Sequence, residues 1–310
     1  MNVKLDDNII NERLCCPLCK NSLEKQISKF VCRGCASEYP MREASQGESV
    51  WDFRIHRPPY SVPVGSQRWA EMQNEYEEFY DKVVAQDDFK FHKDAIDSVK
   101  EIYNHEFVVE GRILDVGGSF GTLRHYLKMD RVPFYVSVDP HINVFDNLGS
   151  FPNLLKAYPC LSSPCNFLAC NAEYLPFVKE TFDWVHMRSV LDHFEDPYLA
   201  LRDAYRVLKR GGKILIGLTV YGGKSSLSDR YCGEESLTSK VKRKFREGGV
   251  KALVEAVWGR IAHESADHHM FRWDYDDLVD LLHVTKFRIA KEHWQKPPFS
   301  MCVYIAAVKL

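Results

Sequence analysis

The chain has no long apolar run and no excess of charge of either sign. None of its apolar stretches approaches the roughly 20 residues that a helix needs to cross a bilayer, and MNVKLDDNII lacks the basic-then-apolar pattern of a secretory signal. With 41 Lys and Arg against 43 Asp and Glu, no global field attracts nucleic acid or anionic lipid. These absences argue against a membrane partner, and we expect a cytoplasmic protein on which a local basic patch remains possible.

Internal repeats and low-complexity tracts are also missing, so a solenoid or a disordered chain is not indicated. The composition, 45% hydrophobic and 27% charged, is that of a soluble globular protein, and 310 residues suit one large domain with an appendage. The Pro-rich stretch HRPPYSVPVG predicts a boundary, because each proline discourages regular structure. We therefore expect a small module at residues 1–55, a linker at 56–68 and a large domain at 69–310.

Cysteine is plentiful, and half of the ten cysteines lie in CCPLCKNSLEKQISKFVCRGC. Cys16 with Cys19, and Cys32 with Cys35, form two C-x2-C pairs that suit four thiolates around one Zn²⁺ ion. A single pair is also typical of a redox motif, but two pairs separated by a short strand favour structural zinc. Cys15 is an alternative to Cys16, which has the better spacing and a proline behind it.

This first segment resembles the zinc-ribbon modules that precede some methyltransferase domains, including certain ribosomal RNA guanine methyltransferases. The SEYPMRE sequence after the last of these cysteines looks like their usual ending. Zinc in such a module has two possible roles. It folds a peptide too short for its own core, or the folded ribbon also presents a substrate or a partner.

The large domain alternates strand and helix patterns. An aromatic stripe predicts a core-packed helix over 69–83, and a second helix is expected over 92–103. From residue 111 the segments RILDV, GTLRHYLKM, FYVSVD, a helix near 141–148, NFLAC, FDWVHM, PYLALRDAYRVLK and KILIGLTV predict βαβ units around a parallel sheet. A helix over 275–282 then precedes TKFRIAKEHW and SMCVYIAAVKL, which predict an antiparallel hairpin at the sheet edge.

The order of ILDVGGSFG, YVSVDP, CNAEYLPF, FDWVHMRSVLDHFEDP and YRVLKRGGKILI resembles class I S-adenosylmethionine-dependent methyltransferases, most closely the group often labelled type 11. The resemblance spans roughly residues 111–310. It implies a Rossmann-like α/β fold with a mostly parallel seven-stranded sheet, and S-adenosylmethionine as the cofactor. A nicotinamide-binding loop would instead favour G-x-G-x-x-G.

The first loop is expected to hold the methionine end of that cofactor. Gly117, Gly118 and Gly121 supply the tight turn, and Ser119 stands where the family usually has its middle glycine. The Ser119 hydroxyl is expected either to bond the cofactor or to cap the following helix. By the resemblance, Asp115 orders the loop and meets the cofactor's amino group, directly or through water.

Other residues of the resemblance point to the remainder of the cofactor. Asp139 ends the second strand and can accept hydrogen bonds from both ribose hydroxyls. Asn171 and Ala172 correspond to an Asp-Ala pair that commonly meets adenine. Arg188 is also assigned to the cofactor site, although it lies near the expected acceptor entrance together with His193.

A base is needed only when the acceptor is a hydroxyl, whose proton must leave as the bond forms. His193 is our first candidate, with a loop-shaping or cofactor-contacting role as the alternative. The stretch 221–273 is expected to form a cap-like insertion over the acceptor. Its His268 and His269 are further candidates for a base or a hydrogen-bond donor, with purely structural roles or a second metal site as alternatives.

Three functions follow. The first is methyl transfer to a small molecule, with an oxygen of a sugar, glycan precursor or specialised metabolite as acceptor. The second is RNA base methylation, motivated by the ribbon and by the basic segment KVKRKFR. The third is a non-catalytic scaffold that retains the cofactor fold, motivated by the departures at Ser119 and Asn171. The sequence leaves the choice between monomer and homodimer open.

Overall fold

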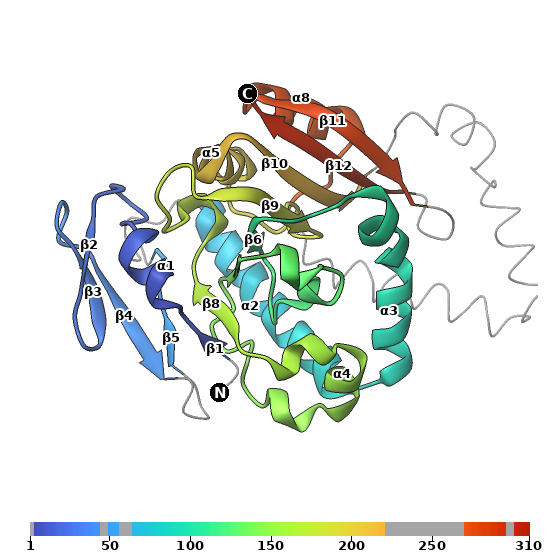
Figure 1. The fold of residues 1–310 in the computed structure, drawn as a ribbon, viewed down its shortest axis with the longest axis horizontal. Helices are drawn as coiled ribbons and strands as arrows, with labels where there is room; N and C mark the ends of the chain where they lie inside the picture. Colours follow the sequence, from blue (N-terminus) through green and yellow to red (C-terminus); the bar gives the residue numbers. More distant parts are fainter. Residues whose placement is uncertain (1–2, 44–48, 56–63, 221–269, 296–300) are drawn as a thin grey trace, which may run out of the picture.

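The structure is a computed structural model that describes residues 3–43, 49–55, 64–220, 270–295 and 301–310. Within these ranges the chain builds an eight-stranded sheet and a separate four-stranded sheet (Figure 1). The strands of the large sheet lie in the order β1-β8-β7-β6-β9-β10-β12-β11. Without β1, this is the order 3-2-1-4-5-7-6 in chain sequence, so the strand order reverses at β6.

The strands of the large sheet are mostly apolar, as expected for a sheet that is covered on both faces. The strands are β1 (Val3–Lys4), β6 (Arg112–Val116), β7 (Phe134–Asp139), β8 (Cys165–Ala169), β9 (Phe182–Arg188), β10 (Leu208–Thr219), β11 (Phe287–Trp294) and β12 (Cys302–Lys309). The pairs from β1 to β10 are parallel, whereas β12 pairs antiparallel with both β10 and β11. The expected parallel sheet and its closing antiparallel hairpin are both confirmed.

Helices cover the two faces of this sheet. They are α2 (Val64–Ala85), α3 (Phe89–Glu101), α4 (Pro152–Ala157), α5 (Pro197–Val207) and α8 (Tyr275–Val284), with a π-helical turn over Ile102–Glu106 after α3. Leu114 of β6 packs in the same core as Leu201 of α5 and Leu278 of α8. Its neighbour Ile113 points to the opposite face and packs in the core that contains Val99 of α3. Adjacent strand residues therefore serve different layers.

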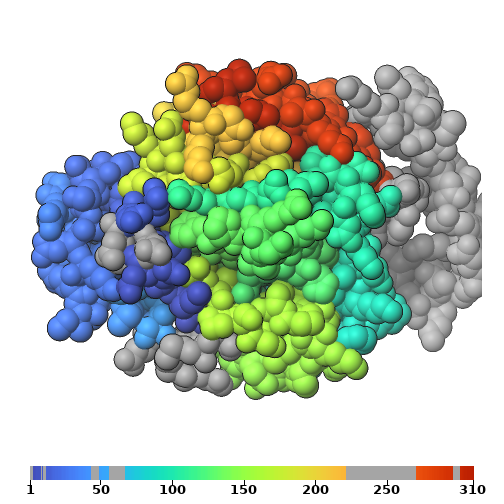
Figure 2. All heavy atoms as spheres, viewed as in Figure 1, coloured from blue at the N-terminus to red at the C-terminus, as the bar shows by residue number. Residues whose placement is uncertain are grey.

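The N-terminal module consists of α1 (Asp7–Glu12) and the strands β2 (Leu23–Lys25), β3 (Lys29–Cys32), β4 (Glu38–Glu43) and β5 (Ser49–Trp51). Its atoms lie directly against the body of the molecule (Figure 2). Phe30, Trp51 and Phe53 share one continuous core with the large sheet, and β1 pairs with β8. The ribbon and the large domain are therefore packed together as one body.

Two expected helices are absent from the described chain. The segment GTLRHYLKM forms only a 3₁₀ turn over Thr122–His125, and residues 141–148 form turns in place of a helix. Both segments are short, and their apolar side chains pack against the sheet without a continuous helical ladder. In the part of the chain described here, no helix combines the length and apolar character needed to span a membrane.

Candidate functional site

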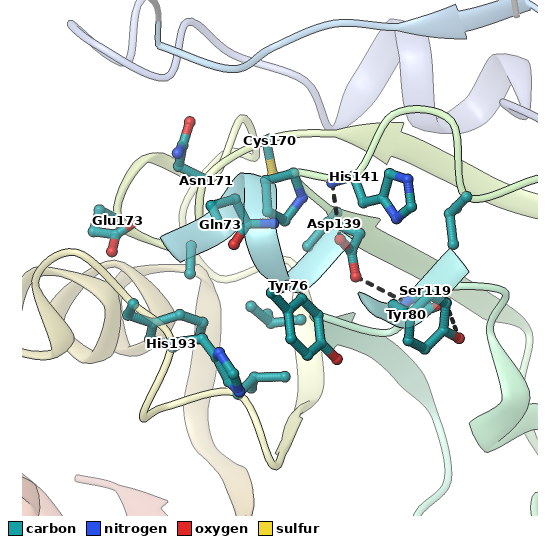
Figure 3. A pocket seen from close by; sticks show the side chains of 18 of the residues that line it. Gln73, Tyr76, Tyr80, Ser119, Asp139, His141, Cys170, Asn171, Glu173 and His193 are labelled. Atoms are coloured by element: carbon teal, nitrogen blue, oxygen red, sulfur yellow. Dashed lines mark hydrogen bonds between the residues drawn. The ribbon is translucent and has the colours of Figure 1, made fainter. Parts of the chain in front are cut away.

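A pocket lies at the carboxyl ends of β6, β7 and β8, where parallel sheets with a reversal of strand order bind ligands (Figure 3). The space between its lining residues is about 680 Å³, a figure that includes open solvent. The strands contribute its floor and α2 covers it. The lining residues used below are Trp69, Tyr76, Tyr80, Gly117, Ser119, Asp139, His141, Cys170, Asn171, Ala172, Glu173 and His193.

The loop after β6 is rich in glycine, so part of its backbone faces the pocket without a side chain. Gly117 has a φ of +67°, and a Cβ there would lie 2.4 Å from Cγ1 of Val190. A Cβ on Gly118 would lie 2.5 Å from the hydroxyl of Ser137, although Gly118 itself does not line the pocket. Gly121, with a φ of +75°, begins the 3₁₀ turn behind the loop. The glycines are therefore required by close packing, and Gly117 also leaves its backbone open to a ligand.

Ser119 adopts a left-handed backbone conformation, with a φ of +47°, that glycine adopts more readily than other residues. Its hydroxyl lies 2.9 Å from the Tyr80 hydroxyl, and its carbonyl accepts a 3.0 Å hydrogen bond from Ser137. The hydroxyl does not cap the following turn, so the capping alternative is wrong. The strained backbone is held by these contacts on both sides.

Asp139 presents a carboxylate to the pocket at the end of β7 (Figure 3). One oxygen accepts the Ser119 N–H at 3.1 Å and the other accepts the His141 N–H at 2.9 Å. Burial raises the pKa of Asp139 to about 6, against the lowering effect of these backbone donors. Each oxygen retains a lone pair, so the group can accept hydrogen bonds from two neighbouring hydroxyls.

Asn171 and Ala172 follow β8 and line the opposite end of the pocket. The side-chain oxygen of Asn171 accepts a 3.1 Å hydrogen bond from the Ile55 N–H. The preceding residues also bind this edge of the sheet: the Phe53 N–H donates to the Ala169 carbonyl at 2.7 Å, and Arg54 donates to the Pro140 carbonyl at 3.1 Å. Three consecutive residues at the end of the N-terminal module therefore hold the strand ends that line the pocket.

Helix α2 covers the pocket with Trp69, Gln73, Tyr76 and Tyr80. The Trp69 indole donates a 2.9 Å hydrogen bond to the His193 carbonyl, and the ring of Tyr76 lies 4.6 Å from the His193 imidazole. Tyr80 bonds Ser119 one turn further on. Core packing was the favoured expectation for this stripe, with ligand contact by Tyr76 or Tyr80 as the alternative. Trp69, Tyr76 and Tyr80 line the pocket, since apolar spacing does not distinguish a hydrophobic core from a closed pocket.

Asp115 and Arg188 lie outside this pocket, on the other face of the sheet. Asp115 is buried, with one oxygen 2.7 Å from Nδ1 of His186 and the other accepting the Tyr135 hydroxyl. Nε2 of His186 lies 2.7 Å from the Tyr103 hydroxyl. The structure therefore gives Asp115 a position behind the glycine loop, where it supports the loop without facing the ligand space.

The candidate bases are divided between described and undescribed parts of the chain. His193 lines the pocket beyond β9, beneath Tyr76 (Figure 3). His268, His269 and all but four residues of the expected insertion at 221–273 lie outside the described residues. The structure consequently brings one of the three candidates to the pocket. Glu173, which the sequence reasoning passed over within CNAEYLPF, also lines it, and burial raises its pKa to about 7.

The four cysteines of the two C-x2-C pairs form a cluster in which all sulfur atoms lie within 4.8 Å of one another. The distance from Cys16 to Cys35 is 3.6 Å and from Cys19 to Cys32 is 3.3 Å between sulfurs. Tetrahedral Zn–S bonds of about 2.3 Å separate sulfurs by about 3.8 Å, so the cluster fits one zinc ion. Cys15 is not part of the cluster, since it lies on the side of the large domain and its N–H bonds the Pro176 carbonyl.

Comparison with known proteins agrees with this geometry. Residues 114–216 match the family model described as a methyltransferase domain. An uncharacterized protein of Methanocaldococcus jannaschii, MJ1123, is 37% identical over 78 residues, which are 25% of this chain and 35% of that protein. The ubiquinone/menaquinone biosynthesis C-methyltransferase UbiE of Agrobacterium fabrum is 34% identical over 108 residues, 34% of this chain and 40% of that enzyme. The chain thus spans no more than two fifths of the length of these curated relatives.

Solved structures with a similar chain course share little sequence. The 1,6-didemethyltoxoflavin-N1-methyltransferase of Burkholderia thailandensis is 12% identical with a TM-score of 0.48, over 89% of this chain and 97% of that one. The magnesium protoporphyrin IX methyltransferase of Synechocystis is 13% identical with a TM-score of 0.41, over 81% and 89%. The strand order, the glycine loop and the match over residues 114–216 together show that the chain carries a class I S-adenosylmethionine-dependent methyltransferase domain.

Proposed function

We propose that the protein transfers a methyl group from S-adenosylmethionine to a small-molecule acceptor. The observation that carries this proposal is the position of Asp139, whose carboxylate faces a pocket between a bare glycine loop and the Asn171–Ala172 turn. Gly117 lines this pocket without a side chain, so a ligand can approach its backbone. When bound, the cofactor supplies an electrophilic methyl group on a positively charged sulfur.

Each element of the pocket has a task in binding that cofactor. Asp139 accepts the ribose hydroxyls, the backbone at Gly117 and Ser119 borders the methionine portion, and Cys170 and Ala172 border the adenine. Helix α2 covers these groups with Tyr76 and its neighbouring aromatic residues and excludes water. Methyl transfer is an in-line displacement, so such alignment can supply up to about 7–11 kcal/mol of the barrier reduction.

The acceptor in this proposal is an oxygen of a sugar, a glycan precursor or a specialised metabolite, and His193 removes its proton. The His193 side chain lies at the edge of the pocket beside Tyr76, and its carbonyl is held by Trp69. An imidazole suits this task because its ordinary pKa is near neutrality. A His193→Gln variant should retain cofactor binding and lose methyl transfer.

RNA is a weaker candidate acceptor because three cations of the described ribbon pair with carboxylates. Lys25 pairs with Asp7, Lys29 with Glu38 and Arg33 with Glu24, within distances of 3.9, 2.6 and 3.6 Å. Paired cations are poorly placed to replace the counterions of a phosphate backbone. The basic KVKRKFR segment lies outside the described residues.

We also propose that the four-cysteine cluster holds one structural zinc ion. Two thiolates from each C-x2-C turn meet in a closed set of four sulfur ligands, which is the pattern of structural zinc and leaves no open position. The ion joins strands β2 to β4 into a module that packs on the large sheet. The module then supports the cofactor pocket through the hydrogen bonds that Phe53, Arg54 and Ile55 donate to the strand ends.

The experiment that tests the main proposal combines binding with turnover. Calorimetry should detect S-adenosylhomocysteine binding to the wild type and a loss of affinity in Asp139→Ala with the fold intact by circular dichroism. Incubation with methyl-labelled S-adenosylmethionine and separate pools of small metabolites, RNA and protein should then label the metabolite pool. Cofactor binding without labelling of any pool would favour the scaffold, and labelling of RNA alone would favour the second function.

A further inference from the structure

A second cavity, here called the α5 groove, lies along helix α5. The first cysteine turn of the ribbon, the turn after α8 and the end of β12 line it together with α5. The space between its lining residues is about 1510 Å³, a figure that includes open solvent. Segments that are far apart in the sequence therefore meet around one open space. Its lining residues include Lys20, Tyr198, Arg202, Arg206, Lys286 and Lys309.

Positive charge exceeds negative charge in the α5 groove. Five lysines and arginines line it, against two acids, Asp203 and Glu173. Asp203 pairs with Lys20 at 3.0 Å and with Arg206 at 2.6 Å, so this group of three keeps one positive charge. Glu173, which also lines the cofactor pocket, is enclosed, and burial raises its pKa to about 7. Even with both acids ionised, the described lining residues keep three uncompensated positive charges.

Three cations of the groove have no ion-pair partner. Within the described ranges, no carboxylate oxygen lies within 4.0 Å of the charged nitrogens of Arg202, Lys286 or Lys309. The guanidinium of Arg202 lies 5.7 Å from the centre of the Tyr198 ring. Lys286 precedes Phe287, which pairs with Lys309 across β11 and β12, so the two lysines are neighbours. The groove therefore contains a pair of lysines and, apart from them, an arginine over a tyrosine.

Lys309 is the enclosed member of these three cations. Its side chain is at the carboxyl end of α5, where the amine donates a 2.6 Å hydrogen bond to the Leu208 carbonyl and lies 4.8 Å from the centre of the Tyr205 ring. An ammonium has three donors, so two remain for a ligand. Burial lowers the pKa of Lys309, and the carboxylate of Glu180 opposes this. An anion bound in the groove would favour the charged lysine in the same way.

A tyrosine ring lies toward the amino end of α5. Tyr198 is the second residue of this helix and is 41% exposed. Phenol rings stack on planar bases, and an arginine over such a ring extends the stacking surface. From Tyr198 to Leu208 the helix rises about 15 Å, which suits one nucleotide and is short for a longer strand. The groove thus presents a stacking surface at one end and cations at the other.

We propose that the α5 groove binds a nucleoside diphosphate, with its phosphates at Lys286 and Lys309 and its base on Tyr198. The inner phosphate carries one negative charge and the terminal phosphate about two, so the ligand matches the three uncompensated positive charges of the groove. A simple carboxylate would leave the stacking surface and part of this charge unused. The site adds a second ligand to the protein and requires no role in methyl transfer.

Calorimetric titration tests this site on protein saturated with S-adenosylhomocysteine, which occupies the cofactor pocket. The probes are ADP, UDP, pyrophosphate, adenosine and uridine. At least one of the two diphosphates should bind about tenfold or more tightly than its nucleoside, and about threefold or more tightly than pyrophosphate, because charge-assisted contacts and stacking both contribute. Its affinity should fall as the salt concentration rises.

Variants at both ends of the groove show whether these residues hold the ligand. Lys309→Met should weaken diphosphate binding about tenfold or more, and Lys286→Met and Tyr198→Leu about threefold or more each. Lys309→Met also frees the Leu208 carbonyl, which can weaken the fold. The exposed residues Lys286 and Tyr198 then carry the test, since neither is enclosed in the core.

Two controls separate this inference from other outcomes. Lys213 also lies over an aromatic ring, that of Trp184, but outside the groove, so Lys213→Met should keep the wild-type affinity for the diphosphate. S-adenosylhomocysteine affinity should not change in Lys286→Met. Its absence in the wild type would refute the proposed function, while the groove variants would still test this inference.

The inference is overturned if neither diphosphate binds, or if pyrophosphate or the nucleoside binds as tightly as the diphosphate. It is also overturned if Lys286→Met and Tyr198→Leu both keep the wild-type affinity, or if Lys213→Met loses as much affinity as Lys286→Met. An RNA decanucleotide that binds more tightly than both diphosphates, and is weakened by the same groove variants, would overturn it and assign the groove to RNA.

Discussion

Cofactor affinity should depend on pH through Asp139. Burial raises the pKa of this carboxyl to about 6, and only its ionised form can accept hydrogen bonds with both oxygens. Affinity is therefore fully present well above pH 6 and is lost as the pH falls through that value. At about pH 5 roughly one tenth of the groups are ionised, so affinity should be about tenfold lower, or about 1.4 kcal/mol.

Stability of the ligand-free protein should change in the opposite direction. The pKa of Asp139 rises from 3.8 in the unfolded chain to about 6 in the folded protein, so the folded state binds the proton more tightly. The stabilising contribution of the protonated group is thus present below about pH 4 and is lost as the pH rises through 6. A fall in affinity at low pH therefore cannot be explained by unfolding that originates at this residue.

The assay is calorimetric titration of S-adenosylhomocysteine between about pH 5 and pH 8. Asp139→Asn keeps the shape but cannot ionise, so it should bind weakly with a flat pH profile in this range. Glu173 lines the same pocket with a pKa near 7, and Glu173→Gln serves as the matched control that should keep the wild-type slope. A flat wild-type profile, or an unchanged slope in Asp139→Asn, would refute the assignment of Asp139.

Three further predictions address the loop, its cover and the ribbon. Gly117→Ala should abolish measurable cofactor binding and lower the free energy of unfolding by about 1–3 kcal/mol, because the φ of Gly117 is positive and a Cβ there would lie 2.4 Å from Val190. Gly149 has no atom within 4 Å of the position that a Cβ would take, so the control Gly149→Ala should change neither calorimetric affinity nor thermal unfolding. Tyr80→Phe should weaken cofactor binding about threefold to tenfold, since it removes a neutral hydrogen bond to Ser119, and unchanged affinity would show that the bond is dispensable. Elemental analysis should find about one zinc per chain, and chelation should lower both the thermal midpoint and cofactor affinity; zinc-free protein of full stability would contradict the zinc site.

The clustered cysteines and the pocket carboxylate could be predicted from the sequence, because such groups are recognised by residue type and short spacing. The two C-x2-C pairs predicted the cysteine cluster, and the acid at the end of FYVSVD predicted Asp139 in the pocket. Alternating strand patterns predicted the parallel sheet and its final hairpin. Helices were predicted less accurately: GTLRHYLKM has helical spacing but forms only a 3₁₀ turn. Packing on the sheet prevailed there over local propensity.

Only the tertiary structure showed to which face of the sheet each polar side chain points. Asp115 and Arg188 lie one position from residues that face or border the cofactor pocket, and strand alternation turns both to the opposite face. The aromatic stripe of α2 became a pocket wall because the helix crosses the carboxyl ends of the strands. The sequence by itself determined the kinds of chemistry present, through residue types and their spacing. Long-range packing determined which of those groups meet, because contacts between distant segments leave no local pattern in the chain.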